Sequence, residues 1–363
     1  MPVDFIGLIA TQDGSESTPA TTALIDPAYT ARIARAHEDS GFDQVLIGYS
    51  SAYPDGAQVA AYAAAHTSTL MYLVAHRPGF VAPTLAARTF ATLDHFTGGR
   101  VTLNIITGGH DVEQRRDGDY LTKDERYART DEYLTVLRRA WTSDTPFSFD
   151  GRFYRFEDFV SQVRPVRGTI PLYFSGSSPA AYATGVKHAD VHMFWGEPLA
   201  QIQEQIASVR AAASAAGLPA PRFSVSFRPI LGPTEELAWQ RAHDILGRIG
   251  QVTAPRFFRG ASTPANVGSQ RLLAAAETGD RHDRALWTAT AKASGAAGNS
   301  TALVGTPETV AQALLDYYDL GVTTFLIRGY DPLDDAIDYG RDLIPAVRAE
   351  VARRDAERLV VAA

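Results

Sequence analysis

The sequence of 363 residues contains no cysteine. This absence excludes disulfide bonds, thiolate metal sites and cysteine nucleophiles. Two common metal-binding patterns are missing as well, since the chain has neither an H-E-x-x-H segment nor an EF-hand loop. The sequence therefore predicts no metal site.

Basic residues are in the minority: 34 Lys and Arg stand against 41 Asp and Glu, a net charge of -7. No cluster of Lys and Arg is long enough to follow a phosphate backbone, so nucleic acid is not expected as a partner. No apolar run reaches the length of a membrane span. The N-terminal segment MPVDFIGLIATQDG lacks the basic start of a signal peptide and is typical of a first strand. We expect a cytoplasmic protein that binds neither membrane nor nucleic acid.

Short apolar, β-rich segments alternate with longer helical patterns along the chain. Eight strands are predicted to begin near residues 3, 43, 70, 101, 171, 191, 222 and 323. They are apolar nearly throughout, as expected when helices cover both faces of a parallel sheet. This pattern predicts an α/β fold, a TIM (β/α)8 barrel forming a single domain over residues 1–363. An open doubly wound sheet is the alternative, but no G-x-G-x-x-G follows the first strand to support a dinucleotide-binding unit.

Two segments interrupt the regular spacing, about 144–167 and about 250–300. The second is rich in Gly, Ala, Ser and Arg and contains ASGAAGNST. Long loops in compact domains are usually functional lids or disordered segments. We interpret both segments as insertions in the barrel and predict that the second is a mobile lid.

Function in such a barrel is expected where the strands end and the following loops begin. These positions are rich in aromatic rings, hydroxyl groups and arginines. In chain order they are Thr11, Gln12 and Asp13; Tyr49, Ser50, Ser51 and Tyr53; Ala75, His76 and Arg77; Asn104, Thr107, Gly108 and Gly109; Gly176, Ser177 and Ser178; Trp195 and Glu197; Arg228; Arg328 and Tyr330.

Two of these segments could hold an anion. The stretch FSGSSPAA combines a strand end with a helix start at Gly176, Ser177 and Ser178, where backbone N–H groups favour a phosphate. Taken alone, such a pattern more often marks an ordinary serine-capped helix. In LTKDERYARTDEY, Lys123 and Tyr127 are four residues apart and share one helix face. A solvated helix start is the alternative there.

Two histidines, His76 and His192, lie in or at predicted strands. The sequence around them does not decide the role of either one. For His192 a core position with a satisfied ring is favoured. For His76 packing and function stay equally open. In RVTLNIITGG, Gly108 permits close approach of the backbone to a planar ligand, although the glycines could equally serve a tight turn.

Five separated stretches resemble, in sequence and spacing, the bacterial-luciferase superfamily and within it the alkanesulfonate monooxygenases that depend on reduced FMN (FMNH2). They are VAPTLAARTFATLDHFTGGRVTLNIITGG, DERYARTDEYLTVLRRAW with FDGRFYRF, IPLYFSGSSPAA, FWGEP and TALVGTPETVAQALLDYYDLGVTTFLIRGYDPLDDA. The resemblance implies FMN at the carboxyl ends of the barrel strands. The implied cofactor contacts are Ala75, His76, Thr107, Gly108, Lys123, Tyr127, Gly176, Ser177 and Ser178.

At Ala75 such enzymes bend strand three under the flavin ring, often through a non-prolyl cis peptide bond. The resemblance also implies the chemistry: reduced FMN adds O2 as a C4a-peroxyflavin, which oxidises a small organosulfur substrate while the protein excludes water. A separate NAD(P)H-dependent FMN reductase supplies the reduced flavin. Such enzymes are expected to be homodimers or homotetramers.

Four residues stand where these enzymes carry catalytic groups: Tyr53, Trp195, Arg228 and Tyr330. Trp195 and Tyr330 match the relatives. Tyr53 replaces their cysteine, and Ser226-Phe227-Arg228 replaces their Arg-x-His, so Arg228 is the expected anion-binding group. Pairing of Arg228 with a carboxylate such as Glu197 or Asp331 is the alternative. Two other functions stay open: a deazaflavin (F420)-dependent oxidoreductase of the same fold, and a non-catalytic flavin-binding protein.

Overall fold

The computed structural model describes residues 2–249, 266–296, 298 and 300–362. The chain divides into two compact units. Unit 1 consists of residues 1–45, 193–207 and 222–363, and unit 2 of residues 46–192 and 208–221.

Each of the eight predicted strands is present and begins within one residue of its predicted start. They are β1 (Asp4–Ile9), β2 (Gln44–Ile47), β3 (Met71–His76), β4 (Val101–Ile105), β7 (Leu172–Ser175), β8 (Val191–Trp195), β9 (Arg222–Leu231) and β13 (Val322–Ile327). The hydrogen-bonded order is β9-β13-β1-β2-β3-β4-β7-β8, and β8 also pairs with β9. This order closes on itself and confirms the predicted α/β TIM-barrel fold.

In unit 1, β9 and β13 form the centre of a parallel ladder, with β1 on one side and the added strand β12 (Ala302–Gly305) on the other. Every residue of β13 is buried, in keeping with a strand covered on both faces. Helices of this unit are α1 (Pro27–Asp39), α8 (Glu235–Arg248), α9 (Val267–Thr278), α10 (Ala289–Ala293), α11 (Pro307–Asp319), α12 (Pro332–Asp338) and α13 (Ile344–Ala362). A π-helical turn, Tyr339–Leu343, joins the last two.

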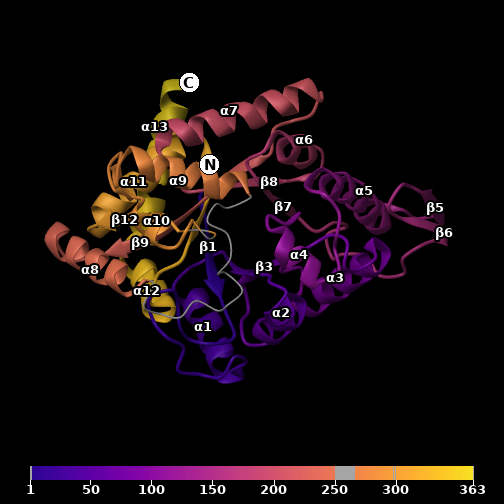
Figure 1. Ribbon diagram of the computed structural model, residues 1–363, viewed down its shortest axis with the longest axis horizontal. Coiled ribbons are helices and arrows are strands. Elements are labelled where there is room, and N and C mark those ends of the chain that lie inside the picture. Colours follow the sequence, from indigo (N-terminus) through magenta and orange to yellow (C-terminus); the bar gives the residue numbers. More distant parts are fainter. Residues whose placement is uncertain (1, 250–265, 297, 299, 363) are drawn as a thin grey trace. The chain divides into compact units, whose positions relative to one another are not determined.

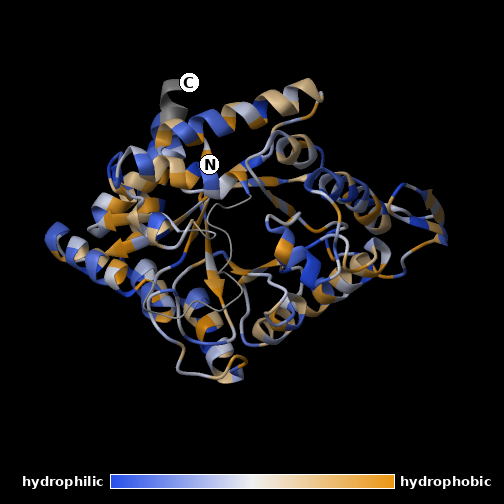
Figure 2. Ribbon diagram, in the orientation of Figure 1, coloured by the Kyte–Doolittle hydropathy of each residue, from blue (hydrophilic) through white to orange (hydrophobic). Residues whose placement is uncertain are grey.

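In unit 2, β4 lies between β3 and β7 in a parallel ladder. The helices are α2 (Gly56–Ala64), α3 (Pro83–Thr97), α4 (Asp111–Arg116), α5 (Lys123–Thr142) and α6 (Pro179–His188), and α5 contacts both α3 and α6 (Figure 1). The buried Trp141 of α5 donates its indole N–H to the carbonyl of Ala87 in α3 at 3.0 Å. Figure 2 shows the strands coloured as hydrophobic and the helices as mixed, the pattern of apolar strands under amphipathic helices.

The predicted insertion at 144–167 contains a β-hairpin, β5 (Phe147–Asp150) paired antiparallel with β6 (Arg155–Phe159). The carboxylate of Glu132 on α5 accepts hydrogen bonds from the backbone N–H groups of three turn residues, 152–154. The hairpin is therefore anchored to the helix that also carries Tyr127.

The predicted lid at about 250–300 lies partly outside the described residues, which omit 250–265, 297 and 299. Its described part contains α9, α10 and the short strands β10 (Arg281–His282) and β11 (Leu286–Trp287). Strand β11 pairs antiparallel with β12. The sequence analysis predicted no strand at β12, because TALVG is too short an apolar run to separate from the loop before it. Mobility of the lid stays a prediction.

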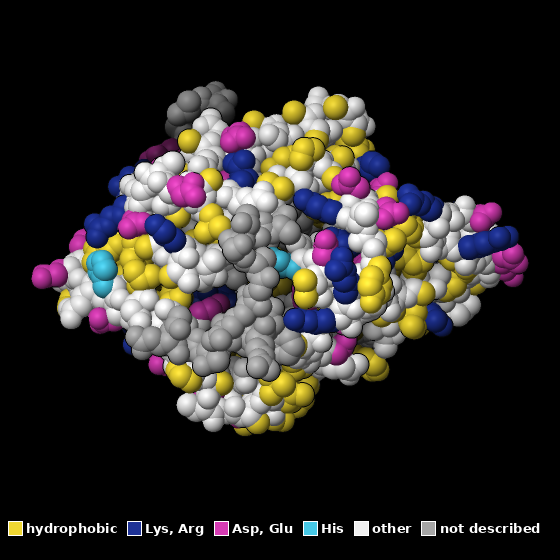
Figure 3. Space-filling view, viewed as in Figure 1, with side chains coloured by type: hydrophobic (Ala, Val, Ile, Leu, Met, Phe, Trp, Pro, Cys, Tyr) yellow, Lys and Arg dark blue, Asp and Glu magenta, His cyan; other side chains and the backbone are white. Residues whose placement is uncertain are grey.

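On the face shown in Figure 3, basic and acidic side chains are interspersed. Among the residues that the structure describes, no helix is both long enough and apolar enough to cross a membrane.

Candidate functional site

In unit 2, the two segments predicted to hold an anion lie in contact. The phenol of Tyr127 on α5 interacts with the side chain of Ser178 at the N-terminus of α6, which opposes the rise in the Tyr127 pKa that burial causes. Gly176 has φ +143°, and a Cβ placed there would lie 2.7 Å from the Cβ of Ala181 and 3.2 Å from the phenol oxygen of Tyr127. Only glycine fits this turn without displacing a neighbour. We call Tyr127, Gly176, Ser177 and Ser178 the cradle.

Ser178 is the N-cap of α6, because its hydroxyl oxygen accepts the N–H of Ala181 at 3.2 Å. Lys123 begins α5 one turn before Tyr127. Among the described residues, no hydrogen bond or ion pair joins Lys123 to the cradle, so its contribution there stays a prediction.

His192 supports the cradle from the core. Its Nε2 donates to the carbonyl oxygen of Gly176 at 2.9 Å. Burial lowers the pKa of His192 to about 4, so the ring is neutral at pH 7. The interpretation of His192 as a buried core histidine is confirmed, and its position shows that it holds the turn at Gly176 in place.

The end of β3 is built into the core of unit 2. Ala75 is buried and pairs with Asn104 of β4. Every peptide bond of the described chain is trans, so the cis bond that the resemblance associates with Ala75 is not found. The Nε2 of His76 lies 2.7 Å from the phenol oxygen of Tyr133, and burial lowers the pKa of His76 to about 4. In this structure His76 is a neutral packing partner of α5.

Three polar side chains near the ends of β3 and β4 are buried with unsatisfied atoms. The hydroxyl of Thr107, both amide atoms of Gln114 and the Nε of Arg77 make no hydrogen bond to any described residue. Gln114, on α4, is 0% exposed. Native proteins leave few such groups unsatisfied, and those that remain often mark a ligand site. These donors and acceptors fit a planar ligand with polar edges, such as a flavin ring.

An ion-pair network holds these side chains in place. Arg77 lies 4.3 Å from the centre of the Tyr49 ring and donates to Glu113 of α4 at 3.1 Å. The Tyr49 hydroxyl donates to Asp117 at 3.0 Å. On α5, the buried Arg126 donates to Asp111 at 2.8 Å and to the carbonyl of Gly108 at 3.5 Å. The loops after β2, β3 and β4 are therefore tied to α4 and α5.

The sequence analysis missed Gln114 and Arg126. Both lie on helices, where glutamine and arginine are usually exposed, and no spacing rule separates them from solvated neighbours. The one available signal was that Arg126 precedes Tyr127 in the DERYAR stretch.

In unit 1, Arg228 lies at the middle of a buried polar group. Its side chain is 2% exposed, and its guanidinium lies 3.9 Å from the centre of the Tyr330 ring. It donates to the carbonyl of Gly329 at 3.0 Å and to both carboxylate oxygens of Glu16, at 3.3 and 3.0 Å. Arg328 donates to the same carboxylate, at 2.7 Å to Oε2.

The carboxylate that pairs with Arg228 is therefore Glu16. The alternative of a carboxylate partner for Arg228 is therefore confirmed, but the two example partners were wrong, because Glu197 pairs with Arg271 at 2.9 Å and Asp331 with Arg241 at 3.3 Å. Glu16 lies in the loop between β1 and α1, which has no pattern that predicts where its side chains point. We call Glu16, Arg228, Arg328 and Tyr330 the arginine site.

Trp195 and Glu197, after β8, hold α9 in place. A Cβ at Gly268 would lie 2.8 Å from the Trp195 ring, so α9 begins directly against the indole. Glu197 is buried and receives the Nε–H of Arg271 from the same helix. Burial raises the pKa of Glu197 to about 7, although Arg271 opposes the shift.

This shifted pKa predicts a pH dependence of stability. The folded protein keeps the Glu197 proton to higher pH than the unfolded chain, whose value is 4.5. The resulting stabilisation is present below pH 4.5 and is lost as the pH rises through about 7. Relative to Glu197→Gln, the wild type should lose unfolding free energy across this range, as measured by urea denaturation at several pH values.

Glu204→Gln is the matched control, since Glu204 also pairs with Arg271 but is exposed. This control should keep the loss of stability with rising pH, shifted to slightly lower pH because the charge of Glu204 contributes to the raised pKa of Glu197. Parallel profiles for wild type and Glu197→Gln would show that the pKa of Glu197 is not raised.

Tyr53 lies in the turn after β2, and its N–H donates to the carbonyl of Ser50 at 3.1 Å. Its ring is 46% exposed. Its predicted catalytic role stays a prediction.

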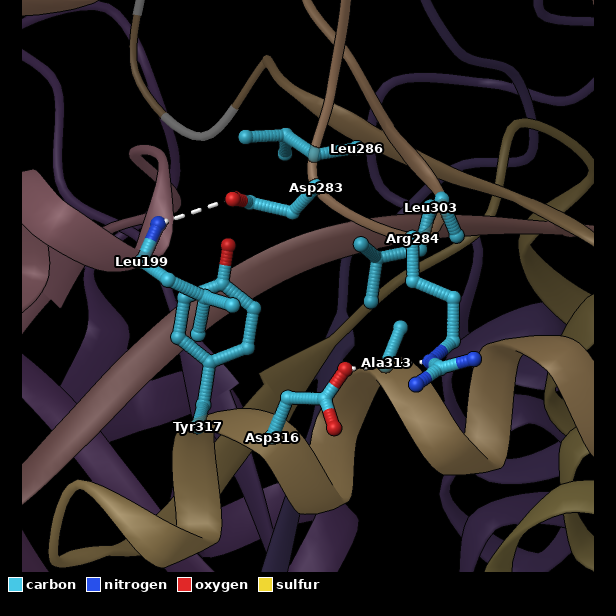
Figure 4. A pocket seen from close by; sticks show the side chains of 9 residues that line it. Leu199, Asp283, Arg284, Leu286, Leu303, Ala313, Asp316 and Tyr317 are labelled. Carbon is cyan, nitrogen blue, oxygen red and sulfur yellow. Dashed lines mark hydrogen bonds and ion pairs between the residues drawn. The ribbon is translucent and has the colours of Figure 1, made fainter.

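A small depression too narrow to hold a water molecule lies elsewhere in unit 1, between β11, β12 and α11 (Figure 4). The Arg284–Asp316 ion pair and the hydrogen bond from the Leu199 N–H to Asp283 border it. It does not include any of the predicted site residues. Among the described residues, no group of three or more His, Asp or Glu side chains could hold a metal ion.

Comparison with known protein families identifies the family to which this chain belongs. Residues 3–324 match the luciferase-like monooxygenase family. The chain belongs to this family. The family is one of monooxygenases, so the chain is assigned to the oxidoreductases.

Solved structures of the same fold cover nearly the whole chain. A riboflavin lyase with modified FMN and riboflavin has a TM-score of 0.80 at 21% identity, covering 96% of this chain and 92% of its own. The EDTA monooxygenase from Chelativorans sp. BNC1 has a TM-score of 0.78 at 17% identity, covering 96% and 94%. An F420-dependent secondary alcohol dehydrogenase has a TM-score of 0.69 at 19% identity, covering 96% and 99%. At these identities the likeness establishes the fold alone.

Proposed function

We propose that this protein is a two-component monooxygenase that uses reduced FMN and O2 to oxidise a small organosulfur anion of the alkanesulfonate type. The observation that carries the proposal is the cradle, where the phenol oxygen of Tyr127 lies beside Gly176 and Ser178 caps the start of α6. A helix N-terminus with adjacent hydroxyl groups suits a phosphate. FMN carries one phosphate, at the end of its side chain.

The residues of unit 2 fit FMN in two respects. The cradle supplies hydroxyl groups and the N-terminus of α6 to the phosphate. Thr107, Gln114 and Arg77 supply buried donors and acceptors that would satisfy the polar edge of the flavin ring. Each of these buried groups costs free energy if it stays unsatisfied, so binding a polar ring beside them is favoured.

When bound, reduced FMN supplies the electrons that activate O2 for transfer of one oxygen atom to the substrate. The chain's own residues bind and orient the cofactor and keep water away from it. A neutral His192 keeps the cradle turn in place, and the ion pairs of Arg77 and Arg126 fix the loops around the ring site. The electrons come from a separate NAD(P)H-dependent FMN reductase, and we propose that the enzyme is a homodimer or homotetramer.

The substrate class rests on the arginine site. A guanidinium binds a sulfonate, sulfinate or carboxylate through two parallel hydrogen bonds, and Tyr330 stacks against Arg228 to hold its plane. Trp195 is the second aromatic residue of unit 1 that the resemblance assigns to this region. The alkanesulfonate class is favoured because FWGEP and TALVGTPETV resemble that branch.

Anaerobic titration with reduced cofactors tests the cofactor assignment. We expect FMNH2 to bind in the micromolar range or tighter and reduced F420 at least tenfold more weakly. Tight binding of reduced F420 with no FMNH2 binding below about the millimolar range would favour the F420-dependent alternative. Binding of FMNH2 with no oxygenated product from any substrate would favour a non-catalytic flavin-binding protein.

A further inference from the structure

The arginine site contains more positive charge than its own carboxylate neutralises. The guanidinium groups of Arg228 and Arg328 both bind the carboxylate of Glu16, which leaves one net positive charge for the three groups. In the neighbouring segment Arg241 pairs with both Asp331 and Asp335, so that group carries one net negative charge of its own. Burial lowers the pKa of Arg328, and repulsion from Arg228 adds to the effect. One carboxylate therefore does not fully balance two guanidinium groups.

The exposed fraction of the side chain differs among the three charged residues of the arginine site. The side chain of Arg228 is 2% exposed, that of Arg328 is 23% exposed and that of Glu16 is 41% exposed. The Glu16 side chain is thus more accessible to solvent than either arginine side chain. A carboxylate can leave this position by rotation of its own side chain, whereas Arg228 is fixed between Tyr330 and Gly329.

The loop that carries Glu16 is held by contacts that do not involve this carboxylate. A backbone hydrogen bond from Ser15 to Thr18 closes the turn around Glu16 at 2.8 Å. Asp13 accepts the N–H groups of Thr21 and Thr22 at 2.7 and 2.8 Å. Release of the Glu16 head group therefore does not require the loop to unfold.

We infer that Glu16 is an internal counter-ion that a small anion replaces, so that Arg228 and Arg328 together form a two-arginine site for the sulfonate or related oxyanion of the substrate. A carboxylate between two guanidinium groups has the geometry that such an oxyanion would adopt. The inference deepens the proposed function and rests on it for the identity of the substrate, but anion binding itself requires no flavin. Arg328 and Glu16 then determine specificity together with Arg228.

Titration calorimetry of the flavin-free protein with sodium ethanesulfonate tests this exchange. The buffer should be Tris at low chloride, because common sulfonate buffers would themselves bind. If the Glu16 carboxylate competes with the anion, the apparent affinity is proportional to the fraction of molecules in which the carboxylate has left the site. Removing the charge of Glu16 should therefore strengthen binding. We expect Glu16→Gln to bind ethanesulfonate at least tenfold more tightly than the wild type, and Arg328→Met to lose that binding.

Glu350→Gln is the matched control, since Glu350 also pairs with two arginines, Arg353 and Arg354. It should bind ethanesulfonate as the wild type does. Equal or weaker binding by Glu16→Gln would overturn the inference and make Glu16 a permanent structural partner of Arg228.

A second measurement uses the wild type and does not depend on folding of a variant. Ethanesulfonate should shift the NMR signal of the Glu16 carboxylate carbon in protein labelled at glutamate, because this carboxylate then leaves both guanidinium groups. A Glu16 signal that saturating ethanesulfonate leaves unchanged would contradict the exchange. Failure of the proposed function is distinguishable: the calorimetric and NMR results would stand while FMNH2 supported no oxygenation.

Discussion

Replacing Arg228 by methionine is expected to lower kcat/KM for an anionic substrate roughly 100-fold or more, as for the loss of about 3 kcal/mol of charged hydrogen bonding. Methionine keeps much of the volume of the side chain and removes the guanidinium group. The effect on folding should be small, since Glu16 keeps its hydrogen bonds to Arg328. Steady-state kinetics with FMNH2 held saturating would measure the change.

Affinity for FMNH2 should stay within about twofold in this variant, because the proposed flavin contacts lie in unit 2. Arg354→Met is the matched control: it removes a largely buried arginine that pairs with Glu350 and Asp319 on α13 and its neighbour. The control should keep wild-type kcat/KM. Full activity of Arg228→Met, or a preference of the wild type for uncharged substrates, would remove the case for an anion-binding role.

Replacing Tyr127 by phenylalanine is expected to weaken FMNH2 binding by about 1.5–3 kcal/mol, roughly 10-fold to 150-fold in Kd. The substitution removes only the hydroxyl group that reaches Ser178, and the ring keeps its packing on α5. The hydrogen bond to a charged phosphate is the larger loss. Anaerobic fluorescence titration with FMNH2 measures the effect.

Tyr318→Phe is a suitable control for Tyr127→Phe, since the Tyr318 hydroxyl donates to Asp355 at 2.8 Å in unit 1. Its FMNH2 affinity should equal that of the wild type. If Tyr127→Phe also binds FMNH2 normally, the phosphate lies elsewhere and the cradle is an ordinary serine-capped helix start.

The fold could be predicted because its signal is repeated. Each barrel strand is a short apolar run followed by a helix. The repeated pattern still predicts a barrel if the bounds of one segment are misjudged. Strand β12 was missed because it is an added strand outside this repeat, paired with β9 and β11. Its four residues follow a segment whose composition is typical of a loop.

The cradle could be predicted because its residues adjoin strand ends. Gly176 and Ser178 follow β7 directly, and Tyr127 belongs to a helix with a clear beginning at Thr122. Glu16 could not be predicted, since it lies in a loop of irregular backbone more than 200 residues before Arg228. Only the folded chain brings this carboxylate to β9, and local sequence rules carry no information on such a contact.

The most direct test of the central claim is product analysis with photochemically reduced FMN supplied in air, without a reductase. The panel should include alkanesulfonates, sulfinates, carboxylates and uncharged sulfides, scored for sulfite, aldehyde and other oxygenated products. A reduced-FMN monooxygenase of the alkanesulfonate type should release sulfite and the matching aldehyde in equal amounts from at least one alkanesulfonate. Hydrogen peroxide as the sole product across the whole panel would contradict the account.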